Sequence, residues 1–285
     1  MVKSKNDIAF DIVVYAIMIF VLLITLIPVL YVVSMSFTPY SEVIRRGGFV
    51  LLPSKFTLTA YKEMLKDGQL YAGLWVTVRL TVLGTLANLV VTLLMAYPLS
   101  RRAMPGNKFI MKCVVFTMLF SAGTVPTYLI VKATGLINTM YAMFVPGLVS
   151  VYNLIIMRAF FEGLPEELFE SARIDGCTEF GVLIRIVLPM SLPILMTIGM
   201  YYAVAHWNAY MVAVLYITDE KLRPLQVILR RMIKTNNMDQ GADEIVPPET
   251  LKMAAVCFAT APIVIIYPFI QKYFVKGTLA GAVKG

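Results

Sequence analysis

Residues 12–35 read IVVYAIMIFVLLITLIPVLYVVSM, without a single charged side chain. A bilayer core of about 30 Å needs about 20 apolar residues for each helical crossing, so this stretch is long enough to span it. A cleaved signal peptide would have a shorter apolar run and a small-x-small cleavage site, and no such site follows between Ser34 and Pro39. We therefore interpret the stretch as a retained signal-anchor helix.

Five more apolar blocks follow along the chain. The 285 residues are 59% hydrophobic and 15% charged, with a mean hydropathy of +0.78, which is more apolar surface than one soluble globule buries. The blocks are continuously apolar and do not alternate, which favours helices over barrel strands. We expect an all-α, polytopic membrane protein with a single domain, 1–285, and six transmembrane helices, over residues 12–35, 70–99, 109–131, 137–161, 187–217 and 251–274.

Basic residues indicate the orientation, because Lys and Arg in short loops mark the cytoplasmic side. They gather in three clusters: Lys3 and Lys5; Arg101, Arg102, Lys108 and Lys112; Lys272, Lys276 and Lys284. We therefore expect a multi-pass inner-membrane protein with both termini in the cytoplasm. The net charge of +8 follows from this topology. Nucleic-acid binding is disfavoured, since the basic residues flank apolar blocks and do not interleave with aromatics.

The sequence lacks the usual patterns of metal and nucleotide chemistry. Cys113, Cys177 and Cys257 are far apart and form no CxxC pair, and His206 has no acidic or thiol neighbour at helical spacing. No G-x-x-x-x-G-K-[ST] phosphate loop is present. We therefore expect a chain that is not an enzyme and binds no cofactor, with any energy supplied by a partner.

A net acidic segment, 158–185, separates the fourth and fifth blocks. Pro165 suits the first turn of a helix, Gly176 is placed to end that helix in a left-handed conformation, and Thr178 suits the start of a second helix. The pattern predicts a helix–turn–helix in the cytoplasm. We expect its apolar stripe to insert into a groove of a partner; the stripe comprises Leu164, Leu168, Phe169 and Ala172.

This segment also carries a family resemblance. Glu170, Ser171 and Ala172, then Gly176 after three residues, then Ile186, Leu188 and Pro189 resemble the EAA motif of permeases of binding-protein-dependent ABC importers. The one departure is Ser171, where the motif usually has alanine. In that family the loop, here 162–186, forms a coupling helix that docks in a cleft of the ATPase. The resemblance implies the type I permease fold and an ATPase-coupling role for Glu170, Ser171, Ala172, Asp175 and Gly176.

Other segments resemble the sugar-permease branch, and most closely the maltose-type second permease. They are YPFIQKYF at 267–274 with the glycines that follow, WNAY at 207–210, and residues 53–65. In that branch the C-terminal tail reaches between the ATPases, which implies such contacts for the tail 275–285, with Gly281 and Lys284. The resemblance implies import of a carbohydrate, as an oligosaccharide. The implied partners are a second permease, expected to form a heterodimer with this chain, two ATPase subunits that hold ATP and Mg, and an extracellular solute-binding protein. The sequence itself leaves open whether the two permeases are identical.

Polar side chains inside apolar blocks are costly, and so they are candidates for the substrate pathway. Aromatic faces near the end of the fifth block could stack on the C–H faces of a sugar. Hydrogen bonds between helices, worth about 1 kcal/mol, and an interfacial aromatic belt explain the same residues, and both readings stay open. The candidate pathway residues are Asn88, Tyr128, Asn153, Trp207, Asn208 and Tyr210.

Other classes of function fit less well. A secondary carrier that works without ATP usually has an intramembrane carboxylate, and the six blocks contain no central Asp or Glu. A membrane-embedded enzyme would need clustered His, Cys or carboxylate side chains. Within the importer class, a non-sugar solute is the alternative, and it is opposed mainly by the tail.

Overall fold

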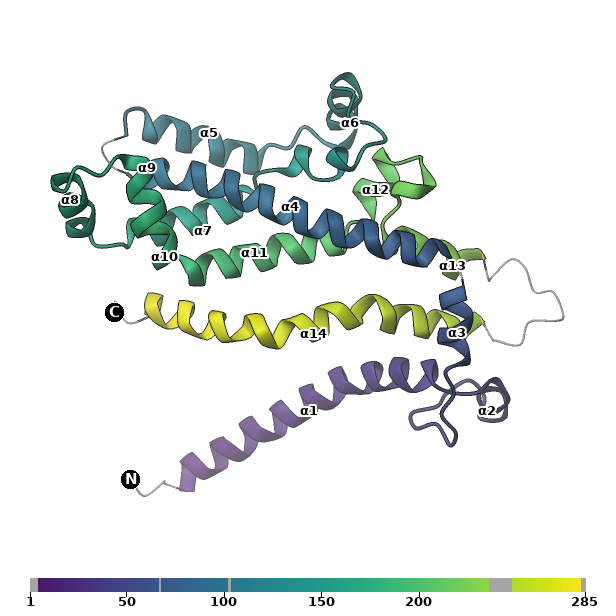
Figure 1. Cartoon of the computed structure of the whole chain (residues 1–285). Helices are drawn as coiled ribbons and strands as arrows, with labels where there is room; N and C mark the ends of the chain where they lie inside the picture. The colour runs from purple at the N-terminus through teal and green to yellow at the C-terminus, as the bar shows by residue number, and fades with distance from the viewer. Residues whose placement is uncertain (1–4, 67, 102–103, 236–247, 283–285) are drawn as a thin grey trace. The chain divides into compact units, whose positions relative to one another are not determined.

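The computed structural model describes residues 5–66, 68–101, 104–235 and 248–282, and every regular element in those ranges is helical (Figure 1). The chain falls into two compact units, where the sequence predicts one domain. One unit contains the residues up to Tyr71 together with Ile228–Pro262, and the other contains Ala72–Val227 together with the residues from Ile263 onward. The sequence shows no sign of this division because its boundaries fall inside helices and not in polar linkers.

Three helices are long and apolar enough to cross a membrane by themselves, namely α1 (Lys5–Ser36), α4 (Gly68–Ser100) and α14 (Pro248–Ala282). Three pairs of shorter helices have the same length and composition only when taken together. Counted as one broken span each, these pairs bring the described chain to six spans, as the sequence predicts. They are α5 (Asn107–Leu119) with α6 (Thr124–Ala133), Met140–Gly147 with α7 (Val151–Glu162), and Glu179–Met190 with α11 (Leu192–Trp207).

The prediction of continuous helices over 109–131, 137–161 and 187–217 is therefore wrong. The three pairs bend by 114°, 55° and 82° at their breaks. Glycine and proline lie at the breaks, since glycine adopts positive φ values that other residues avoid and proline removes a backbone donor. Gly123, with φ of +84°, precedes α6, Pro146 lies in the 3₁₀ turn η2 (Val145–Gly147), and Pro193 opens α11.

Two helix ends also differ from prediction. The fifth span ends at Trp207, and Met211–Tyr216 forms a separate helix, α12. Helix α14 continues to Ala282, so most of the expected tail 275–285 is helical. The remaining elements are α2 (Tyr40–Arg45), α3 (Thr59–Lys66), η1 (Met140–Met143), α8 (Glu166–Ile174), α9 (Glu179–Val182), η3 (Leu183–Val187), α10 (Leu188–Met190), η4 (Glu220–Leu222) and α13 (Leu225–Thr235).

In the first unit, α1 is apolar all round, and none of its most apolar stretch is buried, as suits a helix that faces lipid. Its end is anchored by Tyr61, whose hydroxyl donates to Ser36 Oγ at 2.8 Å. Burial raises the pKa of Tyr61 to about 12, so the hydroxyl keeps the proton that it donates. Glu42 fixes the following loop by accepting from the backbone N–H of Ser54 at 2.8 Å.

The second unit contains the larger core. Buried side chains of α4, α7, α8 and α11 meet there, with the η3 turn completing the cluster. The buried members include Ala96, Tyr97, Leu99, Leu154, Met157, Phe161, Phe169, Ala172, Val187, Ile198 and Tyr202.

Helices α4 and α11 approach each other closely at two glycines. A Cβ atom on Gly84 would lie 2.7 Å from His206 Nε2, and a Cβ atom on Gly199 would lie 3.2 Å from a methyl carbon of Leu89. Small residues of this kind let helix backbones pack tightly in a membrane, where packing replaces the hydrophobic effect.

We expect Gly84→Ala to destabilise the protein by about 1–3 kcal/mol, because the new methyl group would overlap the His206 ring. The measurement is the midpoint of thermal unfolding in detergent. Gly68→Ala is the matched control, because Gly68 starts the same helix and a Cβ there meets nothing within 4 Å. Equal unfolding midpoints for the two variants would contradict the close packing.

Candidate functional site

The helix α8 ends in a Schellman turn at Gly176. Gly176 has φ of +79°, a conformation that glycine adopts without strain. The N–H of Cys177 donates to the carbonyl of Ala172 at 2.9 Å, and the N–H of Gly176 donates to that of Arg173 at 3.1 Å. These two bonds satisfy carbonyls that a helix end leaves open, and the left-handed ending predicted for Gly176 is confirmed.

The next helix, α9, is capped as predicted by Thr178, whose Oγ1 accepts a hydrogen bond from Gly181 N at 3.2 Å. We call residues 162–186 the hairpin; they contain α8, the turn at Gly176, α9 and most of η3. It lies at the end of α4 near which α5 begins (Figure 1).

A carboxylate joins the two arms of the hairpin to α4. Glu179 accepts from Arg173 Nε at 2.9 Å through one oxygen and from the Tyr97 hydroxyl at 2.9 Å through the other. The hydrogen bond to Glu179 raises the pKa of Arg173, so this guanidinium stays charged. The exposed ion pair alone contributes little to stability. The hydrogen bond from Tyr97 to Glu179 fixes the hairpin to α4.

A cation–π contact adds to this attachment. The guanidinium carbon of Arg101 lies 3.4 Å from the ring centroid of Phe169 and 4.9 Å from that of Tyr97. Such contacts contribute about 0.5–2 kcal/mol, with more when the cation is desolvated. The end of α4 and helix α8 therefore hold each other through three aromatic or charged side chains.

The predicted use of the apolar stripe is wrong. Phe169 is 1% exposed, and Ala172 is also buried, both within the core of this same chain. Leu164 packs against the same core, and only Leu168 is exposed. The sequence pattern identifies an apolar face but not what covers it, and here the ends of α4 and α7 do so. Besides Leu168, the hairpin's exposed large apolar side chains are Ile174, which is 86% exposed, Phe180 and Ile184.

Four of the five residues predicted to couple to the ATPase are accessible. Glu170, Ser171, Asp175 and Gly176 are exposed, whereas Ala172 is buried. The hydroxyl of Ser171 donates to the carbonyl of Glu167 at 2.8 Å, so it is used within its own helix. The outer face of the hairpin thus combines acidic side chains with large apolar ones.

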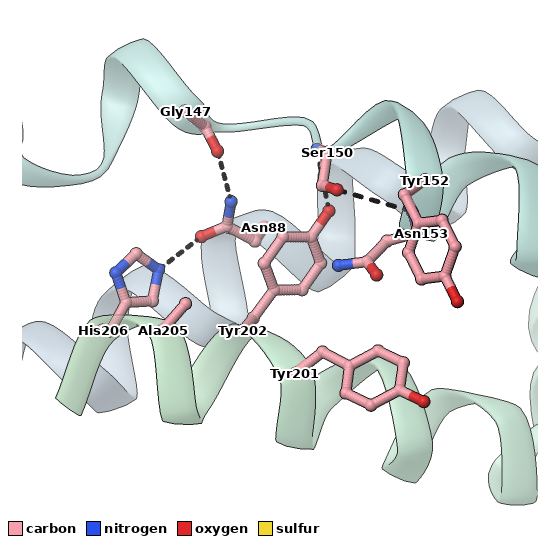
Figure 2. A pocket seen from close by; sticks show the side chains of 9 residues that line it. All are labelled: Asn88, Gly147, Ser150, Tyr152, Asn153, Tyr201, Tyr202, Ala205 and His206. Atoms are coloured by element: carbon pink, nitrogen blue, oxygen red, sulfur yellow. Dashed lines mark hydrogen bonds between the residues drawn. The ribbon is translucent and has the colours of Figure 1, made fainter. Parts of the chain in front are cut away.

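A second feature is a cavity of about 410 Å³ in the larger unit (Figure 2). It forms where the broken fourth span passes α4 and α11. Apart from Ala205, the lining side chains are polar or aromatic, and none of them is Lys, Arg, Asp or Glu. The volume falls within the range of about 300–1,000 Å³ that is typical of small-molecule sites.

Asn88 of α4 builds one wall of this cavity. Its amide nitrogen donates to the carbonyls of Gly147 at 2.9 Å and Leu148 at 2.7 Å, which the break leaves without helical donors. Its amide oxygen lies 2.8 Å from His206 Nε2. Because an amide oxygen only accepts, Nε2 carries the proton in this pair. Asn88 therefore joins the break to both α4 and α11.

Tyr202 of α11 also lines the cavity. Its hydroxyl lies 2.8 Å from Thr92 Oγ1 on α4 and accepts from the backbone N–H of Ser150 at 3.1 Å. Ser150 in turn caps α7, accepting from Asn153 N at 3.5 Å. On each side of the break, a side chain therefore replaces the missing helical hydrogen bonds. Asn88 donates to the carbonyls before the break, and Tyr202 accepts from the backbone N–H of Ser150 after it.

Of the candidate pathway residues, the structure brings only Asn88 and Asn153 together at the cavity. Tyr128 stacks on Tyr216 at 6.1 Å between ring centroids. Asn208 donates to the carbonyl of Val204 in its own helix at 2.9 Å. Trp207 is buried, and Tyr210 packs on another apolar cluster.

The sequence reasoning missed most of the other lining residues. Tyr202 and His206 are four residues apart, so they share one face of α11. Pro146 and Gly147 inside an apolar block, followed closely by three polar or aromatic side chains, are a signal for a helix break with a polar wall. The missed residues are Ser150, Tyr152, Tyr201 and Tyr202.

For the tail, Gly281 lies within α14, and Lys284 lies outside the described residues. Among the side chains that the structure describes, no three His, Cys, Asp or Glu residues are grouped so as to hold a metal ion.

Comparison with known proteins places the chain in a family. Residues 69–279 match the family described as the binding-protein-dependent transport system inner membrane component. The chain is 42% identical over 282 residues to the polygalacturonan/rhamnogalacturonan transport system permease protein YtcP of Bacillus subtilis (strain 168), covering 97% of this chain and 98% of that one. It is 30% identical over 269 residues to the trehalose/maltose transport system permease protein MalG of Thermococcus litoralis, covering 92% and 93%.

A solved structure agrees with these relatives. A chain in the crystal structure of a bacterial ABC transporter involved in the import of the acidic polysaccharide alginate superimposes with a TM-score of 0.88 and 29% identity, covering 96% of this chain and 99% of that one. The family is a transport component and not a catalytic enzyme, and it implies a partner permease, an ATPase and a solute-binding protein. The chain belongs to the inner-membrane components of binding-protein-dependent transport systems, as a membrane-spanning permease subunit of an ABC importer.

Proposed function

We propose that this permease subunit moves an oligosaccharide into the cell. The observation that carries the proposal is the 42% identity, over almost the whole of both chains, to a permease named for polygalacturonan and rhamnogalacturonan. The relative named for trehalose and maltose and the alginate importer support the same substrate class. The alternative of a non-sugar solute has no support among these three proteins.

We also propose the composition of the importer. This chain pairs with a second, different permease, two ATPase subunits bind ATP and Mg, and an extracellular solute-binding protein delivers the sugar. Both termini and the hairpin 162–186 face the cytoplasm, as the basic clusters indicate. The C-terminal residues, including Gly281 and Lys284, reach the ATPases.

The hairpin passes the motion of the ATPases to the membrane spans. Glu170 and its exposed neighbours dock on the ATPase, while the buried side of α8 holds the helix to the chain's own core. The Glu179 bonds and the Arg101 contact then make α4 follow the hairpin. ATP binding favours the closed ATPases and so shifts the pathway from inward-open to outward-open.

We expect Glu170→Lys to abolish transport and to weaken the stimulation of ATP hydrolysis by the loaded binding protein, with the importer still inserted and assembled. The measurement is ATPase activity and uptake of the purified complex in proteoliposomes. Glu63→Lys is the control, because it reverses an exposed charge on α3, which the proposed topology places outside. Normal uptake by the Glu170 variant would contradict the docking role.

The substrate class is tested with the solute-binding protein that belongs to this permease. We expect it to bind short oligosaccharides from a panel of neutral and uronic-acid sugars, and the complete importer to take up those sugars with ATP. Amino acids and peptides serve as competitors that should not displace the bound sugar. Uptake of a competitor in place of every sugar would refute carbohydrate import and leave the importer family unchanged.

A further inference from the structure

We propose that the cavity at the break of the fourth span is a contact site for uncharged hydroxyl groups of the transported sugar, with Asn153 as the residue that binds them. The proposal rests on the proposed function, and it gives this subunit a direct share in holding the solute. Figure 2 shows the Asn153 amide directed into the space beside the rings of Tyr201 and Tyr202.

Asn153 is the unusual polar group of this cavity. Its residue is only 5% exposed, yet its side-chain amide makes no hydrogen bond within the part of the chain that the structure describes. The amide atoms of Asn153 open onto the cavity and are not among the enclosed polar atoms that lack a partner. Asn88, of the same residue type and in the same cavity, uses both its amide nitrogen and its amide oxygen. The free amide of Asn153 therefore faces a space that a ligand can fill.

The chemistry of the lining favours a sugar hydroxyl. An amide offers two donor hydrogens and an acceptor oxygen, and neighbouring hydroxyls of a sugar each donate and accept, so the two match. Tyr152 and Tyr201 add aromatic rings that are 56% and 38% exposed. Their faces suit the apolar C–H side of a sugar ring, as aromatic side chains combine an apolar face with a polar edge.

The same lining disfavours a carboxylate. No lysine or arginine is among the lining residues, so a uronate carboxylate placed here would lose its hydration without gaining a counter-charge. We therefore assign the site to uncharged hydroxyl groups of a sugar. This holds for an acidic sugar too, whose carboxylates would lie elsewhere. A bound water that satisfies Asn153 is the competing explanation, since polar cavities of this size hold water.

The test uses the complete importer in proteoliposomes, with its binding protein loaded with the oligosaccharide selected above and with monodeoxy analogues that the binding protein still retains. The readout is the number of sugar molecules imported per ATP hydrolysed. For the parent sugar, we expect Asn153→Ala to lower this ratio about 3- to 10-fold, the effect of one lost hydrogen bond. For the analogue that lacks the contacted hydroxyl, the same substitution should have little further effect.

Thr117→Ala is the control, because it removes a polar side chain whose hydrogen bond, to the carbonyl of Val114, stays within its own helix. It should leave the ratio unchanged. Thermal unfolding of both variants in detergent separates loss of contact from loss of fold.

An unchanged ratio in Asn153→Ala would overturn the sugar contact and would indicate that the cavity holds water only. An equal loss for the parent and every analogue would also overturn it, since a residue that merely supports the fold does not distinguish one hydroxyl from another. Failure of the unaltered importer to take up any sugar would refute the proposed function itself, and so the two failures are distinguishable.

Discussion

A bilayer supplies no hydrogen-bond partners, so a helix that breaks inside it needs donors and acceptors from elsewhere in the protein. The fourth span depends on this constraint. Its break exposes the carbonyls of Gly147 and Leu148, and one side chain, Asn88, satisfies both. The amide oxygen of Asn88 pairs with His206 Nε2, and the absence of a side chain at Gly84 leaves room for the His206 ring. The cavity lies at the point where side chains, and not a continuous helix, satisfy the hydrogen-bonding groups of the backbone.

The hairpin, which the proposed topology places in the cytoplasm, completes its helix ends by local means. The turn at Gly176 closes the end of α8 with two backbone hydrogen bonds, and Thr178 opens α9 with a side-chain one. No distant residue is needed for the turn itself. Distant residues decide only where the hairpin is held, through Tyr97 and Arg101 at the end of α4. The surface left for a partner is therefore the opposite face of α8.

This difference explains what could be predicted from the sequence. The six spans follow from the lengths of the apolar blocks, and the ends of α8 and α9 follow from a glycine and a threonine a few residues away. The bond from Asn88 to Gly147 joins residues 59 positions apart, and nothing in either neighbourhood specifies it. For the same reason Asn88 and Asn153 could be chosen as polar candidates but not distinguished, and the stripe at Phe169 could be recognised but not assigned to its own core.

Helix α4 is the element that the two sites share. Tyr97 and Arg101 attach one end of it to the hairpin, and Asn88 attaches its middle to the break and to α11. The Asn88 bonds are 2.7–2.9 Å long, near the optimum for such bonds, so a shift of α4 by more than a few tenths of an ångström must either carry the break along or release its carbonyls. Releasing them within a membrane is the costlier outcome. A displacement of the hairpin is therefore expected to reach the cavity walls as a movement of α4, the break and α11 together.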